Sequence, residues 1–346
     1  MTTERDSLLD SLRALIMMYI VCVIHIIYWF GLFDEPLRSI ILFEMPVIFF
    51  IAGASQSLKT TKGKGSLGKE LVDTFVNRTK RVILPFYAFL AILYVFMAVC
   101  TWWFDGAMGF DLTKLSATDF IKTLLTGGCE KINFYGYTWF ISCYFIVSLL
   151  LPVYKRTMTV IGKYPFFALN MMVIILLSFV DLPIGNRELK NIPLYSLFYM
   201  GGYVFYRRIK GKLFVGIAAV STVATIIFFL LDMVTPMQNH KFPADYIFMF
   251  FGISAISLLS LVFSTIKIPN HHIIGLWNTE GYHIYLYQTI TFSIAVCICN
   301  TITTLLHSQI ALYMVYAVTV FLMSTLLAFI SKRIHTLEKT IKITKK

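Results

Sequence analysis

A histidine lies inside the first apolar stretch of the chain, at position 25 within "RDSLLDSLRALIMMYIVCVIHIIYWF" (Arg5 to Phe30). An imidazole is costly in hydrocarbon, and ionisable groups at membrane depth are functional by default. Histidine can take up a proton as a general base, so His25 is the first candidate for catalysis. The alternative is a structural histidine whose ring hydrogen-bonds a backbone carbonyl.

Glu44 is the predicted partner of His25. The histidine lies seven residues before the outer end of the first apolar run, near Leu32, and Glu44 lies seven residues after the start of the second run, near Leu37. At 1.5 Å per residue both fall roughly 10 Å below the outer surface. If the two helices face each other, the carboxylate can hold the imidazole in the tautomer that a general base needs. The alternative is that Glu44 caps an interfacial turn before Pro46.

Three arginines near the cytoplasmic surface can bind phosphate. Arg13 shares a helical face with Asp10 and precedes His25 by twelve residues, roughly 18 Å along a helix axis. Arg78 and Arg81 lie in "NRTKRVILPFY", three residues apart, so both face one way on a helix and can grip a phosphate pair. This arrangement suits a long phosphorylated donor that reaches in from the cytoplasm. The alternatives are an ordinary interfacial ion pair for Arg13 and positive-inside anchors for the other two.

Aromatic side chains lead into the fourth apolar run, in "NFYGYTWFISCYF". Tyr137 and Trp139 either stack on a sugar ring, which would make them acceptor-binding residues, or belong to an interfacial aromatic belt. The six cysteines form neither a disulfide framework nor a metal-binding spacing, so no metal is expected.

Membrane helices must position these residues. Of the 346 residues, 58% are apolar and only 14% are charged, which excludes the ordinary soluble globular class. Apolar runs of about 17 to 25 residues are long enough to cross the hydrocarbon core as helices. The sequence therefore predicts an all-α polytopic membrane protein with about ten transmembrane helices, near 12–32, 37–58, 82–103, 136–154, 164–182, 192–208, 213–235, 244–265, 278–300 and 308–331.

The basic residues predict how these helices are oriented. Lys and Arg accumulate in short cytoplasmic loops, and an N-terminus inside places 23 of the 30 basic residues in cytoplasmic segments. Both termini, including the tail 333–346, are then cytoplasmic. The net charge of +12 is mostly a topology signal and gives little reason to expect a nucleic-acid partner. We expect a single domain, 1–346, that resides in the cell membrane as a multi-pass protein.

Six segments in this order resemble the integral-membrane acyltransferase 3 family: "DSLRALIMMYIVCVIH", "MPVIFFIAGAS", "NRTKRVILPFY", "YTWFISCYFIVSLLLP", "FYMGGYVFYRR" and "EGYHIYLYQ". They cover nearly the whole chain. The resemblance implies transfer of an acyl group, usually acetyl from cytoplasmic acetyl-CoA, to a hydroxyl of a glycan or lipid-linked sugar. The donor is then an acyl-CoA substrate, and no bound cofactor is expected.

The resemblance also implies residue roles. The essential histidine of the family falls on His25, its first-helix arginine on Arg13, and its R-x-x-R pair on Arg78 and Arg81. In that reading His25 deprotonates the sugar hydroxyl or relays the acyl group covalently, and the arginines bind the phosphates of coenzyme A.

Three positions depart from the family pattern. Eleven residues separate Arg13 from His25 where ten are usual, and on a regular helix one extra residue turns His25 by about 100°. A π-bulge, which is a one-residue insertion common at functional sites, would restore the face. In addition, Ala52-Gly53 replaces a Ser-Gly pair, and Gln288 stands where a histidine often closes the last motif.

A second hypothesis is a non-enzymatic exporter of a glycan or small molecule on the same scaffold. His25 and Glu44 would then line a polar pathway. The two hypotheses differ in their demands, because only an enzyme needs a donor site at the cytoplasmic mouth.

Overall fold

The computed structural model describes residues 6–58, 66–104, 110–126, 129, 131–183, 185–209, 211–266, 271–303, 306 and 308–344. Within these ranges the chain forms helices and no strand, which confirms the all-α prediction. The helices are α1 (Ser7–Tyr19), α2 (His25–Trp29), α3 (Leu37–Ile40), α4 (Glu44–Ser57), α5 (Leu67–Arg78), α6 (Leu84–Trp103), α7 (Ala117–Thr126), α8 (Trp139–Leu149), α9 (Leu151–Ile161), α10 (Lys163–Ser178), α11 (Asn186–Phe205), α12 (Lys212–Leu230), α13 (Met237–Lys241), α14 (Tyr246–Phe263), α15 (His272–Thr303) and α16 (Gln309–Thr344).

Short helical segments with other hydrogen-bond patterns connect some of these helices. Two are π-helices, η1 (Ile20–Ile24) and η2 (Thr79–Ile83). The first joins α1 to α2, and the second joins α5 to α6. The others are the 3-10 segments η4 (Leu112–Lys114), η5 (Gly136–Thr138) and η6 (Tyr206–Arg208).

Each of the ten predicted spans coincides with helix, but fewer helices are long and apolar enough to cross a membrane. Seven of the described helices meet that standard, and eight do if the pair Gly136–Leu149 and Leu151–Ile161, bent by 45°, forms one span. The other two predicted spans coincide with α10, which has 16 residues, and with α11, whose first turns are polar. The chain has the helices of an integral membrane protein, whereas ten crossings and cytoplasmic termini stay predictions.

Two compact units divide the chain. Unit 1 comprises Met1–Leu9, Phe33–Thr79 and Cys143–Pro269, and unit 2 comprises Asp10–Leu32, Lys80–Ser142 and Asn270–Lys346. Each unit draws on separate stretches of chain, so neither is a continuous segment of sequence. The single domain expected over 1–346 stays a prediction, and its last two residues lie outside the described part of the chain.

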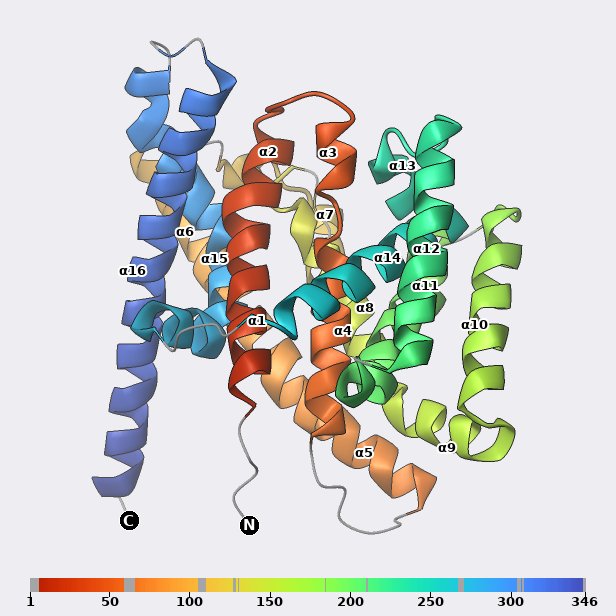
Figure 1. The fold of residues 1–346 in the computed structure, drawn as a ribbon. Helices are drawn as coiled ribbons and strands as arrows, with labels where there is room; N and C mark the ends of the chain where they lie inside the picture. Colours follow the sequence, from red (N-terminus) through yellow and green to blue (C-terminus); the bar gives the residue numbers. More distant parts are fainter. Residues whose placement is uncertain are drawn as a thin grey trace. The chain divides into compact units, whose positions relative to one another are not determined.

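Within unit 1, glycines allow α4 and α11 to pack closely. A Cβ atom on Gly53 would lie 1.7 Å from the carbonyl oxygen of Tyr199, and one on Gly202 would lie 1.9 Å from that of Phe50. Small residues permit such close backbone approach between membrane helices. The helices α12 and α14 pack against each other beside this pair, and α14 crosses α12 obliquely (Figure 1).

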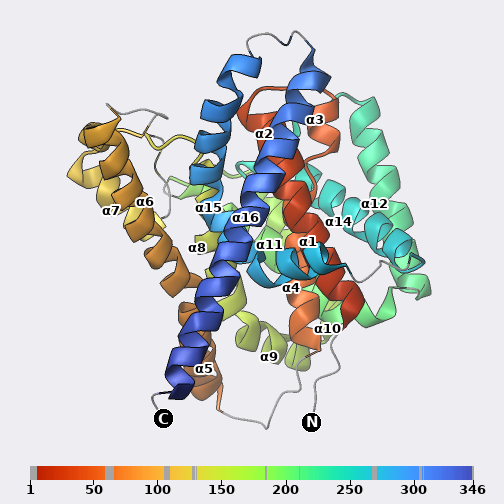
Figure 2. The same cartoon turned by 90° about the vertical axis from the view of Figure 1, so that its left-hand side faces the viewer.

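Within unit 2, α15 and α16 pack side by side, and η1 and α2 lie against α16 (Figures 1 and 2). The indole of Trp277 on α15 stacks on Phe321 of α16 at 5.6 Å between ring centroids and donates a hydrogen bond to Thr325. Because both helices are long, they provide a continuous frame along which polar residues can be held at different depths.

Candidate active site

The first membrane helix contains a π-helical segment between Arg13 and His25, where the sequence has one residue more than the family pattern. Ile20 to Ile24 form the π-helix η1 inside a continuous helix, Ser7–Trp29. Twelve regular steps of about 100° would place His25 roughly 120° around the axis from Arg13, whereas eleven steps leave only about 20°. A π-bulge absorbs one residue in this way, so the two side chains return to one face. The predicted π-bulge is confirmed.

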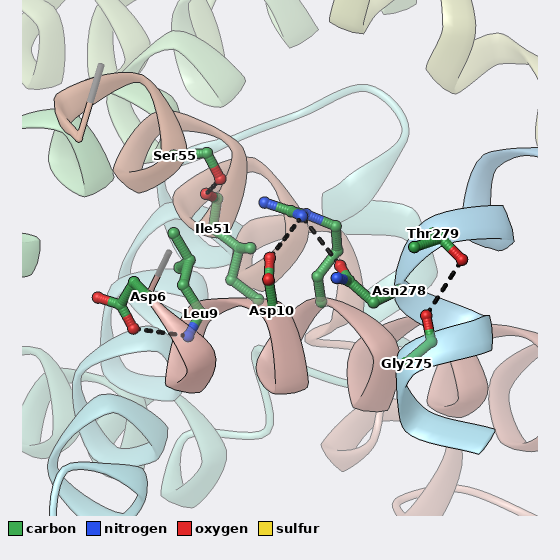
Figure 3. Close-up of polar contacts among 9 residues, drawn as sticks. Asp6, Leu9, Asp10, Ile51, Ser55, Gly275, Asn278 and Thr279 are labelled. Atoms are coloured by element: carbon green, nitrogen blue, oxygen red, sulfur yellow. Dashed lines mark hydrogen bonds and ion pairs between the residues drawn. The ribbon is translucent and has the colours of Figure 1, made fainter. Parts of the chain in front are cut away.

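Arg13 and His25 both contact α15. The Nη1 atom of Arg13 donates to Oδ1 of Asn278 at 2.9 Å and to Oδ1 of Asp10 at 3.2 Å (Figure 3). His25 contacts Gln288, ten residues further along α15. The first helix and α15 therefore run in the same direction, with the arginine and the histidine at two depths of one seam.

Gln288 determines which ring nitrogen of His25 carries the proton. Its side-chain nitrogen donates to the carbonyl oxygen of Tyr285 at 3.0 Å. A carbonyl only accepts hydrogen bonds, so the other amide atom, the oxygen, faces His25. That oxygen contacts Nδ1 of the histidine, which must then be the protonated nitrogen, because an amide oxygen cannot donate. In the neutral imidazole Nε2 is consequently the basic atom.

Aromatic rings surround this buried pair. His25 is 8% exposed, and Gln288 is fully buried. The ring of Trp29 stacks on the imidazole with centroids 4.4 Å apart and planes 13° apart, and the centroids of Tyr137 and Tyr285 lie at 5.8 and 6.4 Å. Aromatic rings thus enclose the imidazole, and interactions of a charge that develops there are poorly screened by water.

The two predicted acceptor-binding residues have different surroundings. Tyr137 is buried, and its hydroxyl donates to the backbone oxygen of Leu286 at 2.5 Å and lies 3.0 Å from Oγ1 of Thr289. It is therefore part of the wall that holds the histidine in place. Trp139 begins α8, is half-buried, and lies edge-on to Phe140. Sugar stacking on either ring stays a prediction.

Arg78 is held by two tyrosines in unit 1. Its Nη1 and Nη2 atoms each lie 3.3 Å from a hydroxyl oxygen, that of Tyr144 for the first and Tyr199 for the second. The guanidinium also lies 5.8 Å from the ring centroid of Tyr144, within cation–π range. A guanidinium has five N–H donors, more than these contacts use, so an orientated Arg78 can still bind phosphate.

Arg81 follows in the π-helix η2 and is exposed. Arg78 is the last residue of the α-helix α5, so the chain between the two arginines is no longer regular α-helix. The expectation that both side chains share one face assumed an uninterrupted α-helix. Arg81 belongs to unit 2 and Arg78 to unit 1, and their joint grip on phosphate stays a prediction.

Glu44 has a basic partner that the sequence did not suggest. Its Oε1 atom lies 2.5 Å from Nζ of Lys241, and both side chains are buried. The second carboxylate oxygen is buried with no hydrogen-bond partner among the described residues. Glu44 belongs to unit 1 and His25 to unit 2, so the expected pairing of the two stays a prediction, while Gln288 is a partner of the histidine within unit 2.

Sequence reasoning noted Gln288 only as a departure from a family pattern, and it missed Asn278 and Lys241. Lys241 is one of the seven basic residues that the predicted topology leaves outside the cytoplasmic segments, and this unusual placement was the available signal. Among the described residues, no three His, Cys, Asp or Glu side chains gather as metal ligands.

Comparison with known proteins matches residues 6–333 to a family model described as an acyltransferase domain. No curated protein and no solved structure gives a significant match. The matched segment contains every candidate residue described above and all ten predicted spans.

Proposed function

The chain belongs to the acyltransferase 3 family, and from this premise we propose that it transfers an acyl group, acetyl from acetyl-CoA in the first instance, to a hydroxyl of a cell-surface or exported glycan. The family indicates a membrane acyltransferase. Donor, acyl group and acceptor are our proposal. The observation that carries it is the contact between His25 and Gln288, because it leaves Nε2 of a buried imidazole as the basic atom.

His25 acts as the general base in this proposal. As the acceptor oxygen bonds to the thioester carbonyl carbon, its proton moves to Nε2 of His25. The carbon–sulfur bond then breaks, and the imidazolium returns the proton to the departing thiolate of coenzyme A. The products are an ester of the glycan and free coenzyme A. The oxygen of Gln288 accepts from Nδ1 throughout, so the ring keeps its orientation in both protonation states.

Gln288 takes the orienting role that the sequence suggested for Glu44. An amide oxygen accepts a hydrogen bond without carrying a charge, whereas a carboxylate would add a formal charge among the aromatic rings. A neutral partner costs less to bury, and it places no negative charge beside the imidazole.

The donor lies along the first helix in this proposal. Arg13 and His25 share a face of that helix. Because the π-bulge absorbs one residue, they lie roughly 17 Å apart along the axis, slightly closer than on a regular helix. A long donor can therefore meet the arginine with its phosphates and the histidine with its thioester. Arg78, held by Tyr144 and Tyr199, and the exposed Arg81 supply further phosphate contacts. Their planar guanidinium groups suit bidentate binding of phosphate oxygens.

The test is acetylation of extracted cell-surface glycan, measured by mass spectrometry in cells that lack the protein. These cells receive the wild type, His25→Ala or His271→Ala at matched membrane levels; His271 is exposed. We expect the wild type and His271→Ala to restore the mass increment of acetyl and His25→Ala not to restore it. Restoration by His25→Ala would show that the histidine is structural. If the wild type adds no acetyl group, the proposed acyl group or acceptor is wrong.

A further inference from the structure

A large apolar cavity lies within unit 1, between α4, α10, α11, α12 and α14. Its volume is about 730 Å³, which is within the range of roughly 300–1,000 Å³ for ligand pockets. The side chains that line it are almost all aromatic or aliphatic, and they include Phe50, Phe167, Phe198 and Ile253. Two lining residues, Leu213 and Val220, are 48% and 68% exposed, so the cavity is open along α12.

Positive charge gathers at one end of this cavity. Lys212, the first residue of α12, is the one charged side chain among the described residues that line it. Lys163, the first residue of α10, holds its ammonium group 4.7 Å from the ring centroid of Tyr164, which also lines the cavity. Both helices begin at this end, and both place an ammonium group beside the apolar volume.

The connection that leads into Lys212 is also basic. Arg207 and Arg208 lie in η6, between the lining residues Phe205 and Lys212, and both are exposed. Basic pockets between membrane helices bind anionic lipid head groups, and clustered Lys and Arg attract anionic lipids. A ligand that suits this site therefore combines a hydrocarbon chain with a negative charge at one end.

We propose that the cavity binds one anionic phospholipid, whose hydrocarbon chain fills the apolar volume and whose phosphate meets the ammonium groups of Lys212 and Lys163. A free phosphate has no hydrocarbon to bury against the apolar lining, and a lipid of zero net charge does not neutralise the positive charge of the two lysines. This lipid site lies wholly within unit 1, and it does not depend on the proposed acyl transfer.

The test counts lipids on the purified full-length protein by native mass spectrometry. The protein in detergent is titrated with phosphatidylglycerol or with phosphatidylcholine of the same chain composition. We expect the wild type to bind one phosphatidylglycerol about tenfold more tightly than phosphatidylcholine. Lys212→Gln should lower the affinity for phosphatidylglycerol severalfold and leave that for phosphatidylcholine unchanged, whereas Lys69→Gln, at an exposed lysine of α5, should alter neither.

A second variant tests the apolar part of the site. Gly216 lines the cavity, and a Cβ atom there meets nothing within 4 Å, so Gly216→Phe can fill the volume without a backbone clash. It should lower the affinity for both lipids about tenfold or more. Val215→Phe is the matched control, because Val215 is exposed, lies outside the cavity lining and points about 100° away from Gly216 around the same helix.

Two results would overturn the proposal. One is equal affinity of the wild type for the two lipids, which would show that only unspecific annular lipid binds. The other is unchanged phosphatidylglycerol binding in Gly216→Phe, which would place the lipid elsewhere. Size-exclusion chromatography checks that each variant is folded, and if Gly216→Phe is not, the comparison of Lys212→Gln with Lys69→Gln decides.

Discussion

Gln288 presents its amide oxygen to Nδ1 of His25 while its amide nitrogen is bound to the carbonyl of Tyr285. The side chain therefore cannot turn over without breaking both contacts. Replacing it by leucine keeps a similar volume but removes the acceptor, which leaves a buried N–H unpaired.

We expect Gln288→Leu to lower kcat by roughly thirtyfold, because the imidazolium that forms in the transition state loses a charge-assisted hydrogen bond that contributes about 2 kcal/mol. KM for acyl-CoA should stay the same, since the amide is a positioning group for the base. Gln288→His should retain more activity, as a ring nitrogen can accept the hydrogen bond. Steady-state kinetics on purified protein measures both constants, with Gln238→Leu, at an exposed glutamine, as the control. A Gln288→Leu enzyme with wild-type kcat would remove Gln288 from the mechanism.

Arg78 is expected to affect donor binding and not the chemical step. Charge-assisted hydrogen bonds contribute about 1.5–3 kcal/mol each, so Arg78→Ala should raise KM for acyl-CoA by roughly ten- to a hundredfold. Tyr199→Phe removes one hydroxyl that orients the guanidinium and should raise KM severalfold. Lys80→Ala, at an exposed neighbouring position, is the control. An unchanged KM in Arg78→Ala would mean that the donor phosphates bind elsewhere.

The buried pair of Glu44 and Lys241 offers a test of whether the carboxylate is structural or catalytic. Lys241→Met leaves the carboxylate buried without its cation, and we expect a loss of about 3–5 kcal/mol of stability. The double variant Glu44→Gln with Lys241→Met removes both charges and should recover most of that loss. Thermal unfolding in detergent measures the stability.

Activity of the same double variant separates the two roles of Glu44. We expect it to retain acyl transfer, because Gln288 already occupies Nδ1 of His25. A stable double variant that has lost activity would instead support the sequence-based hypothesis that Glu44 orients the histidine.

Gly53 is expected to tolerate no side chain. A Cβ atom there would overlap the carbonyl oxygen of Tyr199 at 1.7 Å, and backbone atoms cannot move aside as a flexible side chain can. Gly53→Ala should therefore cost at least about 1–3 kcal/mol of stability, as overpacking does. Gly68→Ala, where a Cβ atom meets nothing within 4 Å, should cost nothing. Equal unfolding temperatures for the two variants would contradict the close packing of α4 and α11.

A histidine in the connection before α14 should make stability depend on pH. Burial alone lowers the pKa of His240, but the hydrogen bond and charge of Asp245, with a backbone contact from Met233, raise it above its ordinary value of 6.5. Its Nδ1 atom lies 2.6 Å from the Asp245 carboxylate. A raised folded pKa stabilises the fold fully below pH 6.5, and the contribution disappears as pH rises through the higher folded value.

Unfolding temperatures of the wild type and His240→Gln across this pH range test the effect. The advantage of the wild type should be largest on the acid side and should vanish on the alkaline side. A difference that is constant with pH would mean that His240 contributes by packing alone.

Local patterns predicted much of this molecule. Each predicted apolar run coincides with helix. Helical hydrogen bonds join residues four apart, so they depend on the local sequence and not on distant parts of the chain. The π-helix of Ile20 to Ile24 was also predictable. One additional residue between Arg13 and His25 would rotate the imidazole away from the face of Arg13, and a π-bulge is the local structure that absorbs a single residue. The number of crossings was harder to predict, because apolarity alone does not distinguish a span from a short apolar helix such as α10.

Distant pairings were not predictable in the same way. Gln288 is 263 residues from His25, and Lys241 is 197 residues from Glu44. Counting residues from the membrane surface estimates depth, but many side chains share one depth in a helical bundle. Depth thus suggested Glu44 as a neighbour of His25, which stays a prediction, but it gave no indication of Gln288, which lies on a helix near the other end of the chain.

Because of the wide turn at Ile20 to Ile24, a one-residue deletion in the first helix should disturb the site less than a one-residue insertion. Losing one residue there would relax the turn to an ordinary α-helix and still leave Arg13 and His25 facing α15. Gaining one would need a second bulge or would swing the imidazole away from Gln288 by about 100°. What the helix must preserve is therefore a direction, and the number of residues between the two side chains can vary around it.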